Sequence, residues 1–176
     1  MILTRRQVLM HGGAAVGVGF GPLLKTSSQD TIDIKQDIID IKMSGRRDGS
    51  HVWFDPLGIH ISVGQTIRWT NVDPGNAHTA TAYHPENGAY PLRIPHSAEP
   101  WDSGYLLPGR MFSVTFMEQG VYDYFCIPHR LAGMVGRIVV GHVEGSPYDD
   151  LALPKGQRNA FPSVESIVTE GLVRAS

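Results

Sequence analysis

The chain has 176 residues, of which 41% are hydrophobic, so it is long enough for one domain with a buried core plus tails. Its formal net charge is −2, and it has no run of Lys and Arg with interleaved aromatic residues, which argues against a nucleic-acid-binding protein. The 20 glycines and 12 prolines favour short strands and turns over long helices.

Residues 1–30 are expected to be an export signal that is not part of the folded domain. Arg5 and Arg6 precede an apolar stretch rich in Gly and Ala that runs to Leu24, and Thr4–Leu9 resembles a twin-arginine signal. The stretch is too short and too rich in Gly to predict a membrane span, although an uncleaved leader would act as a membrane tether. The expected location is the periplasm or the outer face of the cytoplasmic membrane. The alternative is a disordered leader that happens to contain two arginines.

Residues 31–144 have the pattern of an all-β domain. Apolar and polar residues alternate in short runs, and turn sequences rich in Gly, Pro, Asn and Asp separate these runs. The expected strands are 32–43, 51–54, 59–63, 66–70, 111–116, 121–126 and 135–140. Many short strands separated by turns predict a sandwich or barrel and not a parallel α/β sheet. The stretch 76–104 is expected to be irregular.

The C-terminal extension, residues 145–176, is expected to start with a loop over 145–161 and to end in a short helix. Ser163 is a candidate N-cap of this helix, and Glu165 would lie in its first turn. One helical face is expected to carry the apolar side chains of Val164, Ile167, Val168 and Leu172. The sequence leaves open whether the helix packs on the sandwich or on a partner.

Three residues with metal-binding side chains lie between the last two expected strands. Two residues separate Cys126 from His129, and four separate His129 from Met134. His78 is a fourth candidate, because it follows the 66–70 strand and an Asn-containing turn. A thiolate and two imidazoles with a weak axial thioether form the ligand set of blue copper electron-transfer sites. The sequence therefore predicts one copper ion that cycles between Cu(II) and Cu(I).

The backbone around these residues supports a tight loop. Cys126 is the only cysteine, so it cannot form an intramolecular disulfide and is available for packing, chemistry or metal binding. A turn through Pro128 would bring His129 back beside Cys126. Gly133 and Gly136 would allow the chain to bend around the methionine and begin the next strand.

The run Tyr-x-Tyr-Phe-Cys-x-Pro-His-x-x-x-Gly-Met-Val-Gly-x-Ile-Val-Val, which ends at residue 140, resembles the copper loop of the cupredoxins. The similarity is greatest to the plastocyanin and pseudoazurin branch and extends over about residues 31–142. It implies a Greek-key β-sandwich with copper at one end. The resemblance assigns the ligand roles to His78, Cys126, His129 and Met134.

Two further residues are expected to lie directly behind the ligands, namely Thr79 and Pro128. The family often has Asn after the first ligand histidine, where this chain has Thr79. The Thr79 hydroxyl is expected to connect the two ligand segments. The substitution leaves open whether the Cys126 sulfur still receives a hydrogen bond from this position.

An apolar rim is expected around the exposed edge of His129, and it would suit weak, transient docking of redox partner proteins. The rim consists of Pro128, Leu131, Ala132 and Gly133.

Strand alternation places Tyr122 and Tyr124 on the core face with Cys126, and Phe125 on the other face. Phe125 is read as a surface packing residue, with a lateral electron exit as the alternative. Five other histidines are read as surface residues, namely His51, His60, His84, His96 and His142.

The favoured function is an exported one-electron carrier. A copper storage or delivery protein is an alternative, although such a protein would expose its ligands for exchange. A second alternative is a copper-dependent reductase or oxidase, or an electron-transfer subunit of one. An enzyme of that kind needs a second metal centre, and this chain has no His-x-His pair and a single cysteine.

Overall fold

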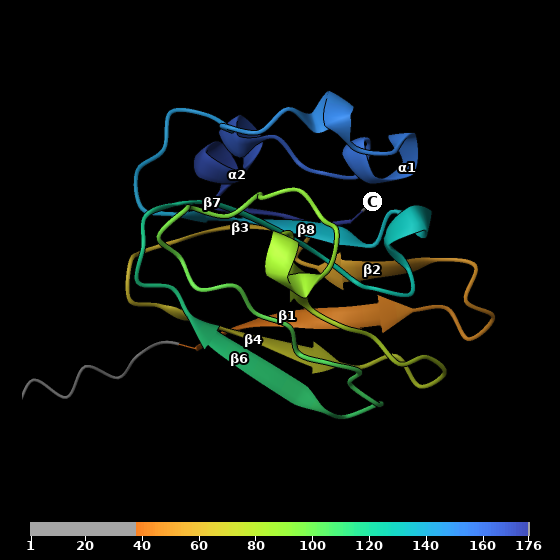
Figure 1. The fold of residues 1–176 in the computed structure, drawn as a ribbon. Coiled ribbons are helices and arrows are strands. Elements are labelled where there is room, and N and C mark those ends of the chain that lie inside the picture. Colours follow the sequence, from red (N-terminus) through yellow and green to blue (C-terminus); the bar gives the residue numbers. More distant parts are fainter. Residues whose placement is uncertain (1–37, 176) are drawn as a thin grey trace, which may run out of the picture. The chain divides into compact units, whose positions relative to one another are not determined.

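Two stacked β-sheets form the framework of residues 38–175, which are the residues that the computed structural model describes (Figure 1). The first sheet has the strand order β2-β1-β4-β6. Its strands are β1 (Ile38–Gly45), β2 (Val52–Asp55), β4 (Thr66–Asn71) and β6 (Met111–Thr115). Strand β1 runs antiparallel to β2 and parallel to β4. The chain crosses to the other sheet between β2 and β4, because β3 belongs to that sheet.

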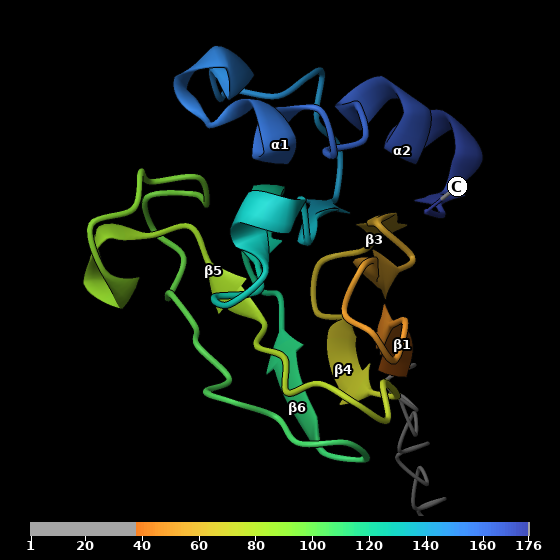
Figure 2. The same cartoon turned by 90° about the vertical axis from the view of Figure 1, so that its right-hand side faces the viewer.

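The second sheet has the strand order β5-β7-β8-β3-β9. Its strands are β3 (Gly58–Ile61), β5 (Thr81–Ala82), β7 (Gly120–Phe125), β8 (Val135–Val140) and β9 (Leu172–Val173). Strands β3 and β8 are parallel, and the other pairs are antiparallel. The turned view in Figure 2 shows the two C-terminal helices on the outer side of this sheet. The predicted all-β Greek-key sandwich with a C-terminal helix is confirmed.

The core between the sheets follows from strand alternation. Tyr122, Tyr124 and Cys126 point to the same buried cluster, which confirms the expected core face of β7. Gly136 lies within β8, where a Cβ atom would be 2.3 Å from the Tyr124 ring. Gly136 therefore makes room for this ring and is not the bend predicted from the sequence. Val63 is also not part of a strand, because β3 ends at Ile61.

The C-terminal extension is more ordered than the predicted loop over 145–161. It contains the 3-10 helix η3 (Asp150–Ala152) and the helices α1 (Lys155–Arg158) and α2 (Val164–Glu170). The Ser163 hydroxyl caps α2 by accepting a hydrogen bond from the Ser166 N–H at 3.0 Å, which confirms the predicted N-cap. Within the described residues, 38–175, no helix is long and apolar enough to cross a membrane.

Two of the four residues predicted to form the apolar face of this helix are buried. Val164 and Ile167 are buried, whereas Val168 is 39% exposed. Leu172 lies beyond the helix, which ends at Gly171 with a φ of 77°, and pairs with Ile59 of β3 as part of β9. The helix packs on the second sheet through the buried cluster that Val164 and Ile167 form with β7 and β8 side chains.

A buried ion network attaches the extension to the sandwich. The Asp123 carboxylate of β7 accepts hydrogen bonds from Arg93 at 2.8 Å and from Arg137 of β8 at 2.7 Å. Both arginines also pair with Asp150 of the extension, and Arg137 donates to the carbonyl of Pro162 at 3.0 Å. Each buried charge therefore has a partner, as the low dielectric of an interior requires. Residues 38–175 accordingly belong to one compact unit.

The stretch 76–104 covers the outer face of β7 next to the candidate site. It contributes β5 and the 3-10 helix η1 (Pro85–Asn87). The rings of Tyr83 and Tyr90 lie 4.4 and 4.6 Å from the Phe125 ring, between centroids, and Phe125 has no exposed surface. The reading of Phe125 as a surface residue was therefore wrong, because this stretch and the extension bury it. The expected leader, residues 1–30, lies outside the described residues.

Candidate metal centre

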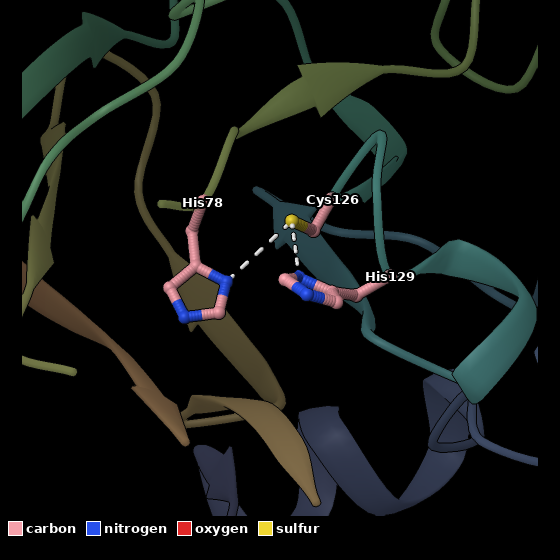
Figure 3. Close-up of side chains that lie close together, drawn as sticks. All are labelled: His78, Cys126 and His129. Carbon is pink, nitrogen blue, oxygen red and sulfur yellow. Dashed lines mark hydrogen bonds between the residues drawn. The ribbon is translucent and has the colours of Figure 1, made fainter. Parts of the chain in front are cut away.

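The side chains of His78, Cys126 and His129 converge at one end of the sandwich (Figure 3). The Cys126 sulfur lies 3.6 Å from Nδ1 of His78 and 3.4 Å from Nδ1 of His129. One ligand atom from each residue lies within 4.8 Å of the other two. Two imidazole nitrogens directed at one thiol form a donor group that fits a soft or borderline metal ion such as copper.

The segment from Cys126 to Met134 is closed by its own backbone. The His129 N–H donates to the Cys126 carbonyl at 3.1 Å, and the Met134 N–H donates to the His129 carbonyl at 3.2 Å. The Cys126 N–H in turn donates to the Met134 carbonyl at 3.0 Å. Gly133 has a φ of 87° and reverses the chain after the 3-10 helix η2 (Arg130–Ala132). Met134 has no exposed surface and lies in the same core cluster as Cys126.

His78 reaches the group from a different part of the chain. Its backbone exchanges two hydrogen bonds with Leu106, at 3.1 and 2.8 Å, on the loop before β6. The Asn71 side chain, at the end of β4, donates to the Leu106 carbonyl at 2.7 Å and to the Asn76 carbonyl at 2.9 Å. These contacts fix the turn from β4, and the His78 side chain is fully buried.

Thr79 connects the two segments in two ways. Its hydroxyl accepts a hydrogen bond from the Ile127 N–H at 2.8 Å, which is the connection expected from the sequence. Its own N–H donates to the Cys126 sulfur at 3.3 Å. The hydrogen bond to the sulfur that the sequence left open is therefore present, and the backbone N–H at position 79 donates it.

The electrostatics of the group suit a metal ion that displaces a proton. Burial raises the pKa of the Cys126 thiol to about 11. Burial also lowers the pKa values of His78 and His129, so both imidazoles are neutral near pH 7. Neutral imidazoles can bind a metal ion directly. The thiol must first lose its proton, and a metal ion that binds thiolate displaces that proton.

A buried carboxylate, that of Asp73, lies behind His78 and was not predicted from the sequence. Its Oδ2 atom lies 3.0 Å from Nε2 of His78, and both side chains are fully buried. Although burial raises the pKa of Asp73, hydrogen bonds from Gly75, Asn76 and His78 together hold it below the usual value. No sequence signal distinguishes this aspartate from other turn aspartates, because the contact depends on how the turn folds.

The other histidines of residues 38–175 do not join the group, as expected from the sequence. His84 caps η1, and Nε2 of His60 contacts the Gly141 carbonyl at 2.8 Å. His51 stacks on Trp53 with ring centroids 4.7 Å apart. His96 and His142 are exposed.

The predicted apolar rim lies on the surface beside His129, which is half-buried. Leu131 is 68% exposed, Pro128 and Ala132 are also exposed, and Gly133 is half-buried. The role of Pro128 behind the ligands stays a prediction, as does the role of the rim in docking.

Comparisons with known proteins agree with this geometry. Residues 41–141 match the family model described as copper binding proteins of the plastocyanin/azurin family. The chain is 33% identical over 104 residues to plastocyanin of Scenedesmus fuscus, covering 57% of this chain and 99% of that protein. It is 32% identical over 93 residues to chloroplastic plastocyanin of Tetradesmus obliquus, covering 53% of this chain and 61% of that protein.

One solved structure with the same fold is pseudoazurin from Methylobacterium extorquens AM1. It superposes with a TM-score of 0.51 at 25% sequence identity and covers 70% of this chain and 92% of that protein.

Proposed function

Because the chain belongs to the plastocyanin/azurin family of copper binding proteins, we propose that it is an exported one-electron carrier with a single copper site. The proposed ligands are His78, Cys126, His129 and Met134. The observation that carries this assignment is the approach of two imidazole nitrogens to the Cys126 sulfur, at 3.6 and 3.4 Å. When bound there, copper would supply a Cu(II)/Cu(I) couple that stores one electron.

The chain's own contribution is a donor set that is assembled before the metal arrives. Backbone hydrogen bonds connect Cys126, His129 and Met134, and Thr79 connects this segment to His78. Such a site needs little rearrangement when its charge changes by one, which favours fast electron transfer. The burial of Cys126 and Met134 excludes water from the sulfur ligands and favours Cu(I).

Electrons are proposed to enter and leave through His129. This imidazole is half-buried within the apolar rim of Pro128, Leu131, Ala132 and Gly133, whereas His78 is fully buried. A small apolar surface suits brief docking, which a carrier needs because it must release each partner quickly.

Storage or delivery of copper is less well supported than electron transfer. A delivery protein needs ligands that a partner can reach, and two of the three convergent ligands have no exposed surface. An enzyme would need further ligands, and the chain has one cysteine and no His-x-His pair. An electron-transfer subunit of a larger reductase or oxidase stays an alternative that partner identification decides.

The proposed division of the chain has an export signal at 1–30, a copper domain at 31–144 and an extension at 145–176. The twin-arginine-like sequence at Arg5 and Arg6 supports export to the periplasm or the outer face of the cytoplasmic membrane. If this leader stays attached, it would act as a tether.

The test of this proposal is the visible spectrum after addition of Cu(II) to the purified protein. We expect an intense thiolate-to-copper absorption that disappears on reduction and is absent in Cys126→Ala. A colourless protein, or the same spectrum in Cys126→Ala, would contradict the copper site. Turnover of nitrite or phenols by the copper-loaded protein would instead favour an enzyme.

A further inference from the structure

The carboxylate of Asp73 lies on the far side of the His78 ring from the candidate copper ligands. Its Oδ2 atom is 3.0 Å from Nε2 of His78, and Nδ1 of the same ring faces the Cys126 sulfur at 3.6 Å. Because Asp73 accepts a hydrogen bond, Nε2 carries the proton and the lone pair of Nδ1 is directed into the site. The imidazole therefore connects a buried carboxylate to the metal-binding position.

The surroundings of Asp73 are shaped to hold its carboxylate. The Gly75 N–H donates to Oδ1 at 2.8 Å, and the Asn76 side-chain amide donates to Oδ2 at 2.8 Å. A Cβ atom at Gly45, the last residue of β1, would lie 2.0 Å from Oδ2. A glycine at the end of β1 thus leaves the space that the carboxylate fills.

The negative charge of Asp73 is not neutralised by a basic side chain. Among the ion pairs of residues 38–175, Asp73 pairs only with the His78 ring, and no Lys or Arg joins it. Asp73 also has no exposed side-chain surface, so bulk water screens its field weakly. The His129 ring, in contrast, has no carboxylate partner among the ion pairs of the described residues, and it is half-buried. It lies 3.4 Å from the Cys126 sulfur through Nδ1 and 4.9 Å from the His78 ring between centroids.

We propose that Asp73 is a positioning residue of the copper site, which orients His78 and lowers the reduction potential by favouring Cu(II) over Cu(I). This inference rests on the proposed ligand role of His78. A fixed negative charge one imidazole away stabilises the more positive metal ion. A carboxylate that accepts the Nε2 proton also makes the ring a stronger electron donor at Nδ1.

The primary test compares the reduction potentials of the copper-loaded full-length protein and its Asp73→Asn variant by protein-film voltammetry. Asn preserves the size of the side chain, and its oxygen can still accept from Nε2. Its NH2 group cannot accept from the Gly75 N–H as Oδ1 does, so the variant removes the charge and one hydrogen bond from the backbone. We expect the Cu(II)/Cu(I) equilibrium to shift at least tenfold toward Cu(I), which is a rise of about 59 mV for a one-electron couple. An unchanged or lower potential in Asp73→Asn would overturn the inference.

Asp48→Asn is the matched control, since it removes the same charge from the exposed turn next to this segment. Asp48 accepts hydrogen bonds from Ser50, and a Cβ atom at the neighbouring Gly49 would lie 3.9 Å from the Asn76 side chain. We expect a shift of less than twofold there, because solvent screens an exposed charge. An equal shift in both variants would mean that net charge and not the contact to His78 is responsible.

A second measurement needs neither copper nor a substituted Asp73. In ¹⁵N NMR of the metal-free protein, His78 is expected to be protonated at Nε2, and its N–H should exchange more slowly than that of His129. Protonation of His78 at Nδ1 would contradict the contact even if Asp73→Asn fails to fold. Gly45→Ala keeps the charge of Asp73 but displaces its carboxylate. We expect faster exchange of the His78 Nε2–H in this variant, and unchanged exchange would also count against the inference.

The outcomes also separate this inference from the proposed function. If the unmodified protein shows no thiolate-to-copper absorption, the copper site itself fails. If the absorption is present and the potential does not respond to Asp73→Asn, only the role of Asp73 fails.

Discussion

The two segments that supply the candidate ligands are held in place in different ways. The copper loop, residues 126–134, is closed by hydrogen bonds among its own backbone groups. The His78 segment, residues 71–79, depends on groups that are distant in sequence, including Leu106 and the space left by Gly45. One half of the site is therefore encoded locally, and the other half is assembled by the fold of the sandwich.

The two segments also differ in their access to solvent. His78 is fully buried and contacts a carboxylate, whereas His129 is half-buried beside an apolar rim. The buried segment is suited to setting the properties of the metal ion. The copper loop is suited to contacting a partner protein. One segment would therefore set the reduction potential, and the other would provide the route by which electrons enter and leave.

The largest expected effect tests this difference in access. Both His129→Gly and His78→Gly should lose the thiolate-to-copper absorption, but added imidazole should restore it only in His129→Gly. The half-buried position lets a small molecule replace the missing ring, and the buried one does not. Visible spectra over an imidazole titration measure the effect, with Cys126→Ser as the variant that imidazole cannot rescue. Equal rescue of both histidine variants would contradict the proposed difference in access between the two segments.

Met134→Gln tests the last residue of the copper loop. Copper should stay bound, and the reduction potential should fall by at least 59 mV, or tenfold in the Cu(II)/Cu(I) equilibrium, because an amide oxygen favours Cu(II) more than a thioether does. Voltammetry measures the change, and Met117→Gln is the control because Met117 is 66% exposed. An unchanged or raised potential would argue against Met134 as a ligand.

Thr79→Ala tests the connection between the segments. It leaves the partly buried Ile127 N–H without this acceptor, so the free energy of unfolding should fall by about 1 kcal/mol in urea denaturation. The visible absorption should persist, because the Thr79 N–H still donates to the Cys126 sulfur in this variant. Thr79→Ser keeps the hydroxyl and should retain most of the stability. Loss of the absorption in Thr79→Ala at full stability would show that the hydroxyl acts on the metal directly.

The smallest expected effect concerns the support that the C-terminal extension gives to the copper loop. A Cβ atom at Gly156 of α1 would lie 2.8 Å from the Leu131 carbonyl oxygen. Gly156→Ala should therefore lower the free energy of unfolding by about 1 kcal/mol, although alanine normally favours a helix. Gly145→Ala is the matched control, because a Cβ atom there meets nothing within 4 Å. Equal stability of the two variants in urea denaturation would show that α1 does not brace the loop.

The difference between a locally closed loop and a segment held by distant residues explains how much of the site could be predicted from the sequence. The spacing of Cys126, His129 and Met134 is local, so the group was visible as a pattern, and the alternation of β7 predicted its core face. His78 needed the family resemblance, because its distance to the loop is set by folding. Asp73 was not predictable, since its contact depends on a turn geometry and on a glycine in another strand.

The C-terminal extension was the least predictable part of the fold. Helix α1 has four residues and includes a glycine, and β9 has two residues, so neither has a clear periodic pattern. Their positions come from tertiary contacts, among them the pairing of β9 with β3 and the hydrogen bond from the Tyr83 hydroxyl to the Gln157 side chain of α1. Such contacts join residues that are far apart in the chain and leave no local signal.

We propose that this chain carries one electron at one copper ion bound through Cys126. The most direct test is a reductive titration of the copper-loaded protein, with the copper content and the visible absorption measured together. We predict one copper ion per chain and an intense absorption that one electron removes and reoxidation restores. A protein that binds copper without this absorption would contradict copper binding through Cys126. An absorption that does not respond to one electron would contradict the role as a one-electron carrier.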